Sequence, residues 1–513
     1  MGSEKYDIII IGTGAGGGTL LHTLKDAGKK ILVLERGTFL PKEKANWDTI
    51  EVFQKDRYHN AEKFLDEKEK EFKPGMGYWV GGNTKVYGAA LFRLREKDFE
   101  TLQHAGGISP EWPVKYYDFE PYYTKAEKLY NVHGKKGLDP TEPFMSEEYP
   151  HEPVSHEPVI EELHKDLQSR GYHPFYVPLG VKLNENDILN SQCIRCDTCD
   201  GFPCMLDAKA DADVNCVRPS IKESHISLLT GMKVTKLITN TAGNSITSVE
   251  AEVDGKKHFF SADTFIVSCG AINSAALFLQ SANDKHPNGL ANKSNQVGRN
   301  FMKHQNAAML ALSRKANKTI FQKTMAVNDF YFGDGEFKFP MGHIQLLGKS
   351  NKDMLASDAP KFAPGFVLDQ MASHSIDWWM TGEDLPDAEN RVTIKNGKVM
   401  LQYRDNNSKG FDRMMMKWKK ILLDCNVCDT ILDHKLYLGK KIPLAGVAHQ
   451  CGTLRFGTDA ATSVLDINCK THEIHNLYVV DGSFFVSSGA VNPSLTIIAN
   501  AIRVGEHILN SIK

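Results

Sequence analysis

The sequence predicts an α/β protein, more specifically an α+β two-domain chain in which one domain is inserted into the other. The first 37 residues have the order strand, glycine-rich turn, helix and strand, which is one βαβ unit. From about 305 to 440 the pattern changes to alternating short strands, which favours an antiparallel sheet. A buried-strand pattern returns over 476–480, and a final helix is expected over 493–509. The second domain is therefore predicted to be an insertion.

The opening βαβ unit carries a glycine motif. A β-branched run over 6–11 suits a buried parallel strand, and helical spacing over 19–27 follows the glycines. Three of these glycines fit the pattern G-x-G-x-x-G: Gly12, Gly14 and Gly17. The first glycine of such a motif makes the tight turn, the second lets the backbone approach a pyrophosphate, and the third lets helix and strand pack closely. The motif predicts a Rossmann-like domain that binds a dinucleotide at the helix N-terminus.

An acidic residue supports this prediction. The second strand, over 31–34, is followed by Glu35, which lies 18 residues after Gly17 and is placed to accept hydrogen bonds from an adenosine ribose. A glycine turn alone also fits an ordinary βα connection. Strand, helix and acidic residue together favour a dinucleotide, although they do not separate NAD from FAD.

Other elements follow from local patterns. The charged segment 41–75 is expected to be helical, with a break at Pro74-Gly75. Further helices are predicted over 113–129, 270–281 and 411–423, and further strands over 233–238, 248–253 and 264–267.

Composition excludes several classes of protein. The 513 residues contain 61 Lys and Arg against 63 Asp and Glu, so the formal net charge of −2 argues against a protein that binds nucleic acid through bulk charge. No stretch approaches the roughly 20 apolar residues that a membrane span requires. The N-terminus lacks the apolar core of a signal peptide, which predicts a cytoplasmic protein, and in such a protein ten cysteines are not expected to form a disulfide framework.

Motifs near the C-terminus carry the strongest functional signal. They read H-Q-C-G-T-L-R-F-G at 449–457, V-V-D-G-S at 479–483 and N-P-S-L-T at 492–496, and they follow G-G-N-T at 81–84, E-W-P at 111–113 and V-G-R-N at 297–300. This succession resembles the glucose–methanol–choline (GMC) family of FAD-dependent oxidoreductases. The resemblance covers most of the chain and implies an enzyme that oxidises an alcohol CH–OH group.

The resemblance implies a role for several C-terminal residues. His449 corresponds to the family's catalytic base, and Asn492 to its partner position. The chemistry agrees, because an imidazole can take the hydroxyl proton while the hydride goes to flavin N5, and an amide can hold the substrate oxygen. Asn492 and Pro493 also fit an N-cap and first residue of the last helix, whose positive end would then face the flavin. Asp481 is expected near the ribityl–pyrophosphate region, or as a simple turn residue before glycine.

The second glycine-rich loop is expected to contact the cofactor through Gly82 and Asn83. Family members with covalently linked flavin use a His or Cys near this loop. Residues 82–88 contain neither, so the prediction is noncovalent FAD.

A cysteine cluster leaves a question open. The thiols of Cys193, Cys196, Cys199 and Cys204 are spaced similarly to an iron–sulfur run, except that the last interval is four residues rather than three. Zinc is a second interpretation, although cysteine-rich zinc sites usually come as two separated pairs. Reduced structural thiols are the third. Some GMC sugar dehydrogenase subunits carry an iron–sulfur cluster in a comparable segment and other branches do not, so we predict no metal and keep these four as candidate ligands.

The inserted region is expected to form the wall of the substrate pocket. The predicted FAD-binding domain comprises 1–150, 190–305 (with the cysteine-rich loop 193–216) and 441–513, and the predicted substrate-binding domain comprises 151–189 and 306–440. Candidate lining residues are His374, Trp378 and Trp379, since sugar rings stack on indole faces; core aromatics are the alternative. We predict a sugar or glycoside as substrate. The alternatives are a sterol or aliphatic alcohol, or a non-redox lyase of the same fold. The electron acceptor, oxygen or a redox partner, is left open, and with it the choice between oxidase and dehydrogenase.

Overall fold

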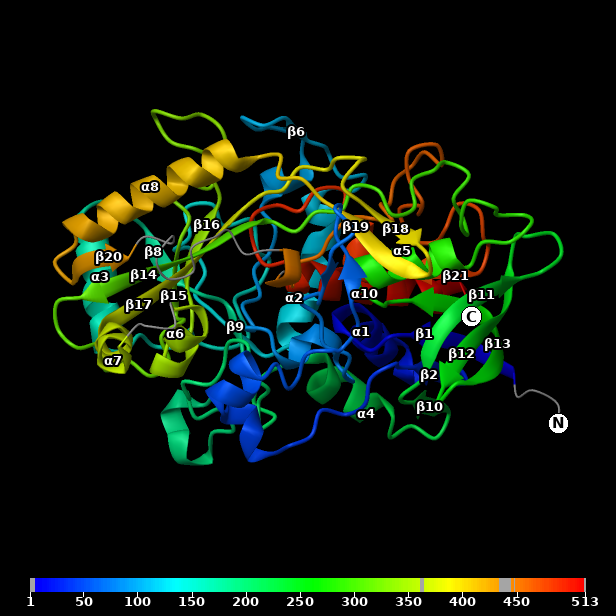
Figure 1. Ribbon diagram of the computed structural model, residues 1–513, viewed down its shortest axis with the longest axis horizontal. Coiled ribbons are helices and arrows are strands. Elements are labelled where there is room, and N and C mark those ends of the chain that lie inside the picture. Colours follow the sequence, from blue (N-terminus) through cyan, green and yellow to red (C-terminus); the bar gives the residue numbers. More distant parts are fainter. Residues whose placement is uncertain (1–4, 360–363, 433–443, 447, 512–513) are drawn as a thin grey trace.

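The computed structural model describes residues 5–359, 364–432, 444–446 and 448–511. It confirms the predicted α/β class and contains two large sheets toward opposite ends of an elongated molecule (Figure 1). The predicted domain boundary between residues 440 and 441 lies outside the described residues.

The first sheet has seven strands within the described chain, and its centre is parallel. In order across the sheet they are β10 (Ile226–Leu229), β2 (Ile31–Leu34), β1 (Lys5–Ile11), β13 (Lys256–Val267), β12 (Ile246–Val253) and β11 (Lys233–Thr239), with β21 (Leu477–Val479) also paired to β13. The run Ile8 to Ile11 in β1 is almost completely buried, as expected for a strand that helices cover on both faces.

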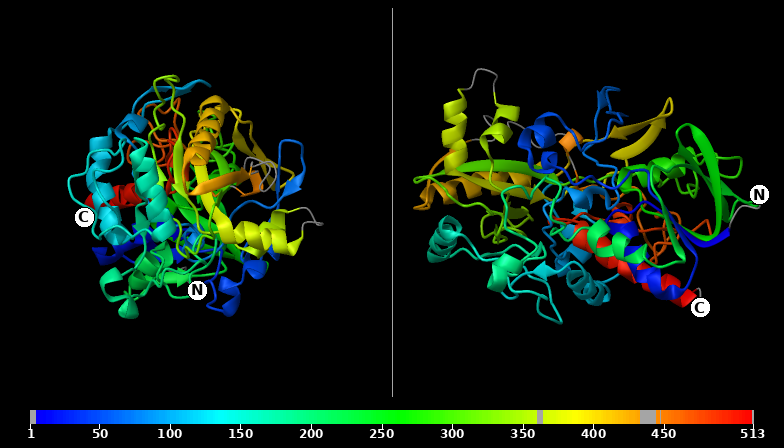
Figure 2. Two further views of the ribbon diagram at one scale, coloured as in Figure 1. Left: turned by 90° about the vertical axis from the view of Figure 1, so that its left-hand side faces the viewer. Right: turned by 90° about the horizontal axis from the view of Figure 1, so that it is seen from below.

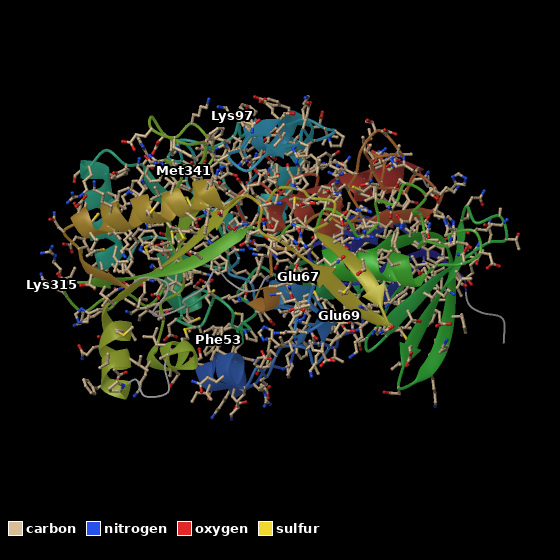
Figure 3. The ribbon with its side chains drawn as sticks, turned by 45° about the horizontal axis from the view of Figure 1, so that its top comes forward. Phe53, Glu67, Glu69, Lys97, Lys315 and Met341 are labelled. Carbon is tan, nitrogen blue, oxygen red and sulfur yellow. The ribbon has the colours of Figure 1, made fainter. Side chains whose placement is uncertain are left out.

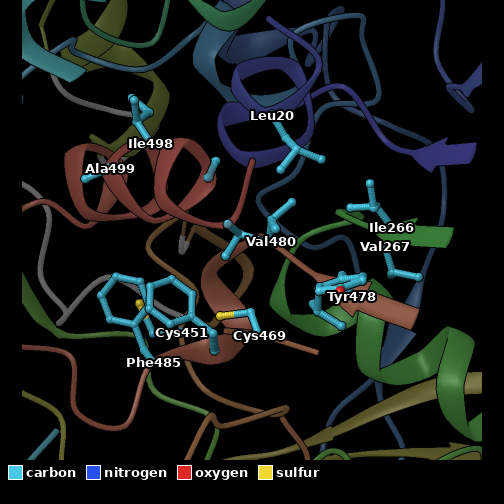
Figure 4. Packing of buried hydrophobic residues seen from close by; sticks show 14 of the residues in the cluster. Leu20, Ile266, Val267, Cys451, Cys469, Tyr478, Val480, Phe485, Ile498 and Ala499 are labelled. Atoms are coloured by element: carbon cyan, nitrogen blue, oxygen red, sulfur yellow. The ribbon is translucent and has the colours of Figure 1, made fainter. Parts of the chain in front are cut away.

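Two helices far apart in sequence pack together on this domain. α1 (Ala15–Leu24) and α10 (Ser494–Ser511) lie side by side, with α2 (Tyr116–Leu129) against α10 (Figure 2). Leu20, Val480 and Ile498 belong to the same buried cluster at this junction (Figure 4). Packing between the two ends of the chain therefore brings the C-terminal segment to the N-terminal glycine loop.

The second sheet is antiparallel and has six strands in the part of the chain that is described. Its order is β20 (Cys428–Leu432), β14 (Gln305–Ser313), β17 (Ser375–Gly382), β16 (His343–Leu346), β15 (Met325–Val327) and β8 (Pro174–Tyr176). α8 (Ser408–Asp424) and α3 (Pro158–Ser169) share a core with one face of this sheet. α6 (Lys352–Asp358) and α7 (Gly365–His374) pack against Leu310 on the other face.

Two predictions about local structure need correction. The segment 41–75 is not a long helix: it forms short helical turns at Lys44–Trp47 and Ile50–Gln54 and the small strands β3 (Phe64–Leu65) and β4 (Glu71–Phe72). Its charged residues provide no apolar stripe long enough to hold a helix against the core. The other predicted helices and strands are present with shifted ends, including α5 (Ala271–Gln280).

The hairpin of β18 (Arg391–Lys395) and β19 (Lys398–Gln402) also departs from the predicted division. Its strand β19 pairs with β3, which in turn pairs with β4, and β18 contacts α5. Val392 and Leu401 belong to the larger core of the nucleotide-binding region. The hairpin therefore packs with that region although the sequence pattern assigns it to the substrate domain. Among the helices of the described residues, none combines the length and apolar character needed to cross a membrane.

Candidate active site

One cavity of about 740 Å³ is lined by residues from both large sheets. Its size lies within the usual range for ligand and cofactor sites. At one end it reaches the turn after β1 and the end of β2, and at the other it reaches Gln345 on β16 and Trp379 on β17. Phe53, which also lines the cavity, is partly exposed beside α6 (Figure 3).

The glycine loop has the geometry that its motif requires. Gly12 has φ of +95°, and a side chain there would meet the Ser268 carbonyl oxygen at 2.3 Å. Gly14 lines the cavity, and a Cβ added to it would have no neighbouring atom within 4 Å, so the loop is open to a ligand at this point. A Cβ on Gly17 would lie 2.1 Å from the Gly12 carbonyl oxygen, which shows that this glycine serves packing.

A fourth glycine, Gly16, occupies a position that the motif leaves variable. A Cβ on Gly16 would lie only 1.8 Å from the carbonyl oxygen of Val480, so α1 and the end of β21 can approach only with glycine here. Asp481, the next residue, accepts hydrogen bonds at Oδ1 from the amide and hydroxyl of Ser483 (2.9 and 2.5 Å). Its Oδ2 accepts from the Gly270 amide at 3.0 Å and from the Ser274 hydroxyl. Asp481 lines the cavity and joins two loops that border it.

Glu35 lies at the cavity wall just after β2. Its Oε2 accepts from the amide and hydroxyl of Thr13 at 2.9 and 2.6 Å, and its Oε1 accepts from the Gly37 amide at 2.8 Å. Burial raises the pKa of Glu35, although these hydrogen bonds act in the opposite direction. The carboxylate is therefore oriented by the glycine loop before any ligand binds.

The second predicted loop lies directly against the first. A Cβ on Gly82, which has φ of +55°, would be 3.0 Å from the Cα of Gly14. Asn83 accepts from the Gly77 amide at 2.9 Å, and both Gly82 and Asn83 line the cavity. Asn83 thus shapes the loop through the backbone.

The donors around the cavity fit a dinucleotide such as FAD. The first turn of α1 contains no acidic residue, so its positive end is free to face a pyrophosphate. The N-terminal residues of α5 and α10 line the same cavity. Arg36, which no sequence motif singles out, also lines it and stacks 3.6 Å from the ring centroid of Tyr78. A glycine cradle, a carboxylate at the cavity wall and converging helix ends are the features that such a cofactor needs.

His449 lies at the other end of the cavity and is half-buried. Its Nδ1 is 3.0 Å from Nδ1 of His304. Burial, together with the neighbouring His304 and His343, lowers the pKa of His449 to about 3, so the ring is neutral at physiological pH. Among the residues that the structure describes, Nε2 of His449 has no hydrogen-bond partner.

Asn492 lines the same cavity, and no hydrogen bond of its side chain is present among the described residues. α10 begins at Ser494, and the Pro493 carbonyl accepts from the Ile497 amide at 3.1 Å. The capping position is therefore held by Pro493, and the expected N-cap role of Asn492 is corrected. Its amide remains available to a ligand.

The three residues predicted to line the substrate pocket differ in their position relative to the cavity. Trp379 lines the cavity with its ring centroid 6.3 Å from that of His449. Trp378 points to the opposite face of β17, because side chains alternate along a strand, and it is fully buried against Trp418. His374 ends α7 and bonds the Ser313 carbonyl through Nδ1, away from the cavity lining. Of the three predicted residues, the structure brings Trp379 to the cavity and places Trp378 and His374 outside its lining.

All ten cysteines are free thiols in the described residues. Burial raises the pKa of Cys193, and Cys196, Cys199 and Cys204 lie close enough to Cys193 to raise it further. No group of three or more His, Cys, Asp or Glu side chains within the described ranges is gathered to hold a metal ion.

Comparisons with known proteins complete the description of the site. Two family models described as GMC oxidoreductase match residues 6–306 and 438–501. Paromamine 6'-oxidase of Streptomyces fradiae is 27% identical, over 99% of this chain and 92% of that protein. The large subunit of fructose dehydrogenase of Gluconobacter japonicus is 25% identical, over 99% and 98%. Pyridoxine 4-oxidase of Mesorbium loti has a similar fold, with a TM-score of 0.68 at 16% identity over 98% of this chain and 99% of that one.

Proposed function

The chain belongs to the GMC oxidoreductases, FAD-dependent enzymes that act on CH–OH donors, and we propose that this member oxidises a hydroxyl group of a sugar or glycoside. One observation carries the proposal. Nε2 of His449 and the amide of Asn492, both without a partner among the described residues, line the same cavity as the N-terminal glycine loop.

The two residues divide the work on the substrate hydroxyl. Nε2 of His449 accepts the hydroxyl proton, and the low pKa keeps this nitrogen unprotonated before the substrate binds. The amide of Asn492 donates to the same oxygen and holds it without competing for the proton. Bound FAD supplies the acceptor for the hydride on the carbon. The substrate leaves as the carbonyl compound, and the proton stays on the imidazole until it is released.

The lining near His449 supports a polar substrate. Gln345 faces Trp379 across the β16–β17 pair, and Lys349 and Ser350 follow along the same wall. An indole face with amide, hydroxyl and ammonium groups suits a ring that carries several hydroxyls. The names of paromamine 6'-oxidase and fructose dehydrogenase support the same substrate class.

Anaerobic reduction of the flavin tests the substrate class. The purified yellow protein is mixed without oxygen with D-glucose, D-fructose, methyl α-D-glucopyranoside, D-glucosamine, 1-butanol or cholesterol, and bleaching is followed at the flavin band. We expect a sugar or glycoside to bleach the flavin fastest. Faster bleaching by butanol or cholesterol would move the substrate to the aliphatic or sterol alternative, and no bleaching by any alcohol would favour the lyase alternative.

Substitution of the base tests the mechanism. His449→Ala is expected to keep bound FAD and to lose about 10²–10⁴-fold in turnover, the usual contribution of a general base. His475→Ala, a change at an exposed histidine near the same segment, is the matched control and should leave turnover unaltered. Full activity in His449→Ala would refute the assignment.

We also propose that FAD is held noncovalently. Within the loop 82–88, which borders the cavity, no residue has an imidazole or thiol for a covalent link. Acid precipitation of the protein should therefore release all of the flavin into the supernatant, and flavin retained in the pellet would contradict the proposal.

A further inference from the structure

A second histidine, His304, contacts the proposed base, His449. His304 immediately precedes β14, is completely buried, and does not line the cavity. Its Nδ1 is 3.0 Å from Nδ1 of His449, and the two rings meet edge to face at 88°. Its Nε2 is 3.2 Å from the carbonyl oxygen of Ser488. Both ring nitrogens of His304 are therefore engaged, one by the base and one by the backbone.

The chemistry of these two contacts decides where the hydrogens lie. A carbonyl oxygen can only accept, so Nε2 of His304 must carry the hydrogen that it donates to Ser488. In a neutral imidazole the other nitrogen is then an acceptor, which makes Nδ1 of His304 the acceptor toward His449. Nδ1 of His449 must in turn carry a hydrogen, and its Nε2 is left with a free lone pair.

The opposite tautomer of His449 is disfavoured on two grounds. Two lone pairs would face each other between the Nδ1 atoms, 3.0 Å apart in a buried site, with no donor between them. The cavity side of the ring would present an N–H, which cannot accept a proton from an alcohol. Burial lowers the pKa of His304 to about 4, so this ring is neutral too and its Nδ1 stays an acceptor.

The Ser488 carbonyl is itself well held. The next residue, Gly489, has φ of +57° and donates its amide to Glu383. The Ser488 hydroxyl donates to the Asp384 carbonyl at 3.2 Å. Ser488 belongs to the segment that leads to Asn492, so the same stretch of chain carries the predicted amide donor and orients the base through His304.

We infer that His304 is a positioning residue, which holds His449 in the Nδ1–H tautomer so that Nε2 is the nitrogen that receives the alcohol proton. The inference rests on the proposed function for its catalytic consequence. The tautomer itself is a property of the protein without substrate and can be measured separately.

The decisive measurement is ¹⁵N NMR of the holoenzyme labelled at histidine nitrogens, without substrate. Protonated and unprotonated ring nitrogens have well separated ¹⁵N shifts, and the resonances that disappear in His449→Gln identify this ring. We expect a protonated Nδ1 and an unprotonated Nε2 on His449. An unprotonated Nδ1 with a protonated Nε2 in the wild-type protein would overturn the inference, whatever the activity data show.

A pair of matched variants tests the catalytic consequence. The oxygen of the amide in His304→Asn can take the place of Nδ1 and accept from His449, whereas the longer His304→Gln amide reaches toward Ser488 and leaves the Nδ1 position without an acceptor. We expect His304→Gln to lose the Nδ1–H form and about 10²-fold or more in kcat, with KM changed less than about threefold, because a base in the wrong tautomer loses most of its activity. His304→Asn should keep the tautomer and lose less than about tenfold.

Flavin absorbance and the melting temperature show whether each variant is folded, and kcat is taken with whichever alcohol of the panel above the wild type turns over fastest. A loss of kcat in His304→Gln with an unaltered His449 tautomer would overturn the inference, as would equal losses in both variants with the tautomer intact. Loss of activity in His449→Ala is the separate test of the proposed function, so the two failures can be told apart.

Discussion

At the glycine-loop end of the cavity, Glu35 and Asp481 have their carboxylate oxygens occupied by N–H and O–H groups of the protein itself. At the catalytic end, Nε2 of His449 and the amide of Asn492 have no protein partner among the described residues. At the glycine-loop end, the protein itself provides the hydrogen-bond partners of these carboxylates, and this fixes the shape of the cofactor site. The second end leaves its groups unpaired, so that their hydrogen-bonding capacity is available to a substrate and its transition state.

The contrast predicts that substitutions at the two ends fail in different ways. Among the changes that compare the two ends, the largest effect is expected at Asn492. Asn492→Ala removes a donor that no protein group uses, so kcat should fall about 10²–10³-fold while the melting temperature stays within about 2 °C. Asn83→Ala is the matched change at the other end: it removes an acceptor for the Gly77 amide and should lower FAD affinity or stability. Steady-state kinetics and thermal melting distinguish them. A large drop in the melting temperature of Asn492→Ala would contradict the proposed difference between the two ends.

The second largest effect is expected at Gly16. Gly16→Ala places a Cβ 1.8 Å from the Val480 carbonyl oxygen, and we expect a loss of about 3 kcal/mol in the free energy of unfolding together with loss of FAD. Gly14→Ala is the control, because its Cβ meets nothing within 4 Å and its φ of −67° suits alanine. It should keep the stability of the apoprotein and weaken only FAD binding. Urea denaturation and flavin titration test the pair; equal stability of both variants would contradict the packing argument.

The two ends should also respond to acid with opposite signs. Burial lowers the pKa of His304 to about 4 and that of His343 to about 3, so the unfolded chain, with ordinary histidine pKa values near 6.5, binds more protons below pH 6.5. Each ring therefore removes up to about 1.4 kcal/mol of stability per pH unit as the pH falls from 6.5 toward its folded pKa. Burial raises the pKa of Glu35 and Asp481, so these carboxyls lose stabilisation as the pH rises instead.

Urea denaturation between pH 7 and 5 measures the sum of these contributions. We expect the wild type to lose stability over this range, and His343→Gln to show a slope smaller by about one proton's worth, roughly 1.4 kcal/mol per pH unit. An unaltered slope in this variant would mean that His343 is not a buried neutral imidazole.

The smallest effect is expected for the indole at the cavity wall. Trp379→Phe keeps an aromatic face but reduces its area, and should raise KM for a sugar about fivefold, or roughly 1 kcal/mol, with little change in kcat or stability. Trp378→Phe, at the neighbouring position in the core against Trp418, should lower the melting temperature and leave KM unaltered. The reverse result, a raised KM in Trp378→Phe and a lowered melting temperature in Trp379→Phe, would show that Trp378 rather than Trp379 faces the cavity.

Local sequence patterns predicted the nucleotide-binding end well. The strand before Gly12, the open position at Gly14 and the carboxylate after β2 are properties of a few adjacent residues, and the structure has each of them. Patterns predicted the substrate wall less well. A Trp-Trp pair on a strand must place one ring on each face, but the sequence does not say which face borders the cavity. The prediction of a helix over the charged segment 41–75 was wrong for a related reason, since charged residues without an apolar stripe do not define a helix.

The sequence by itself determined the family and the α/β fold and predicted which histidine is the base, because motifs such as H-Q-C-G-T and N-P-S-L-T are readable from neighbouring residues. Only the tertiary structure decided what surrounds them. Packing of α10 against α1 brings Asn492 to the cavity that the glycine loop also lines, and Gly16 is required by a carbonyl at Val480, far along the chain. His304 meets His449 across 145 residues of sequence. Hydrogen-bond direction and close packing depend on distances between segments that are remote in sequence, and no local pattern records those distances.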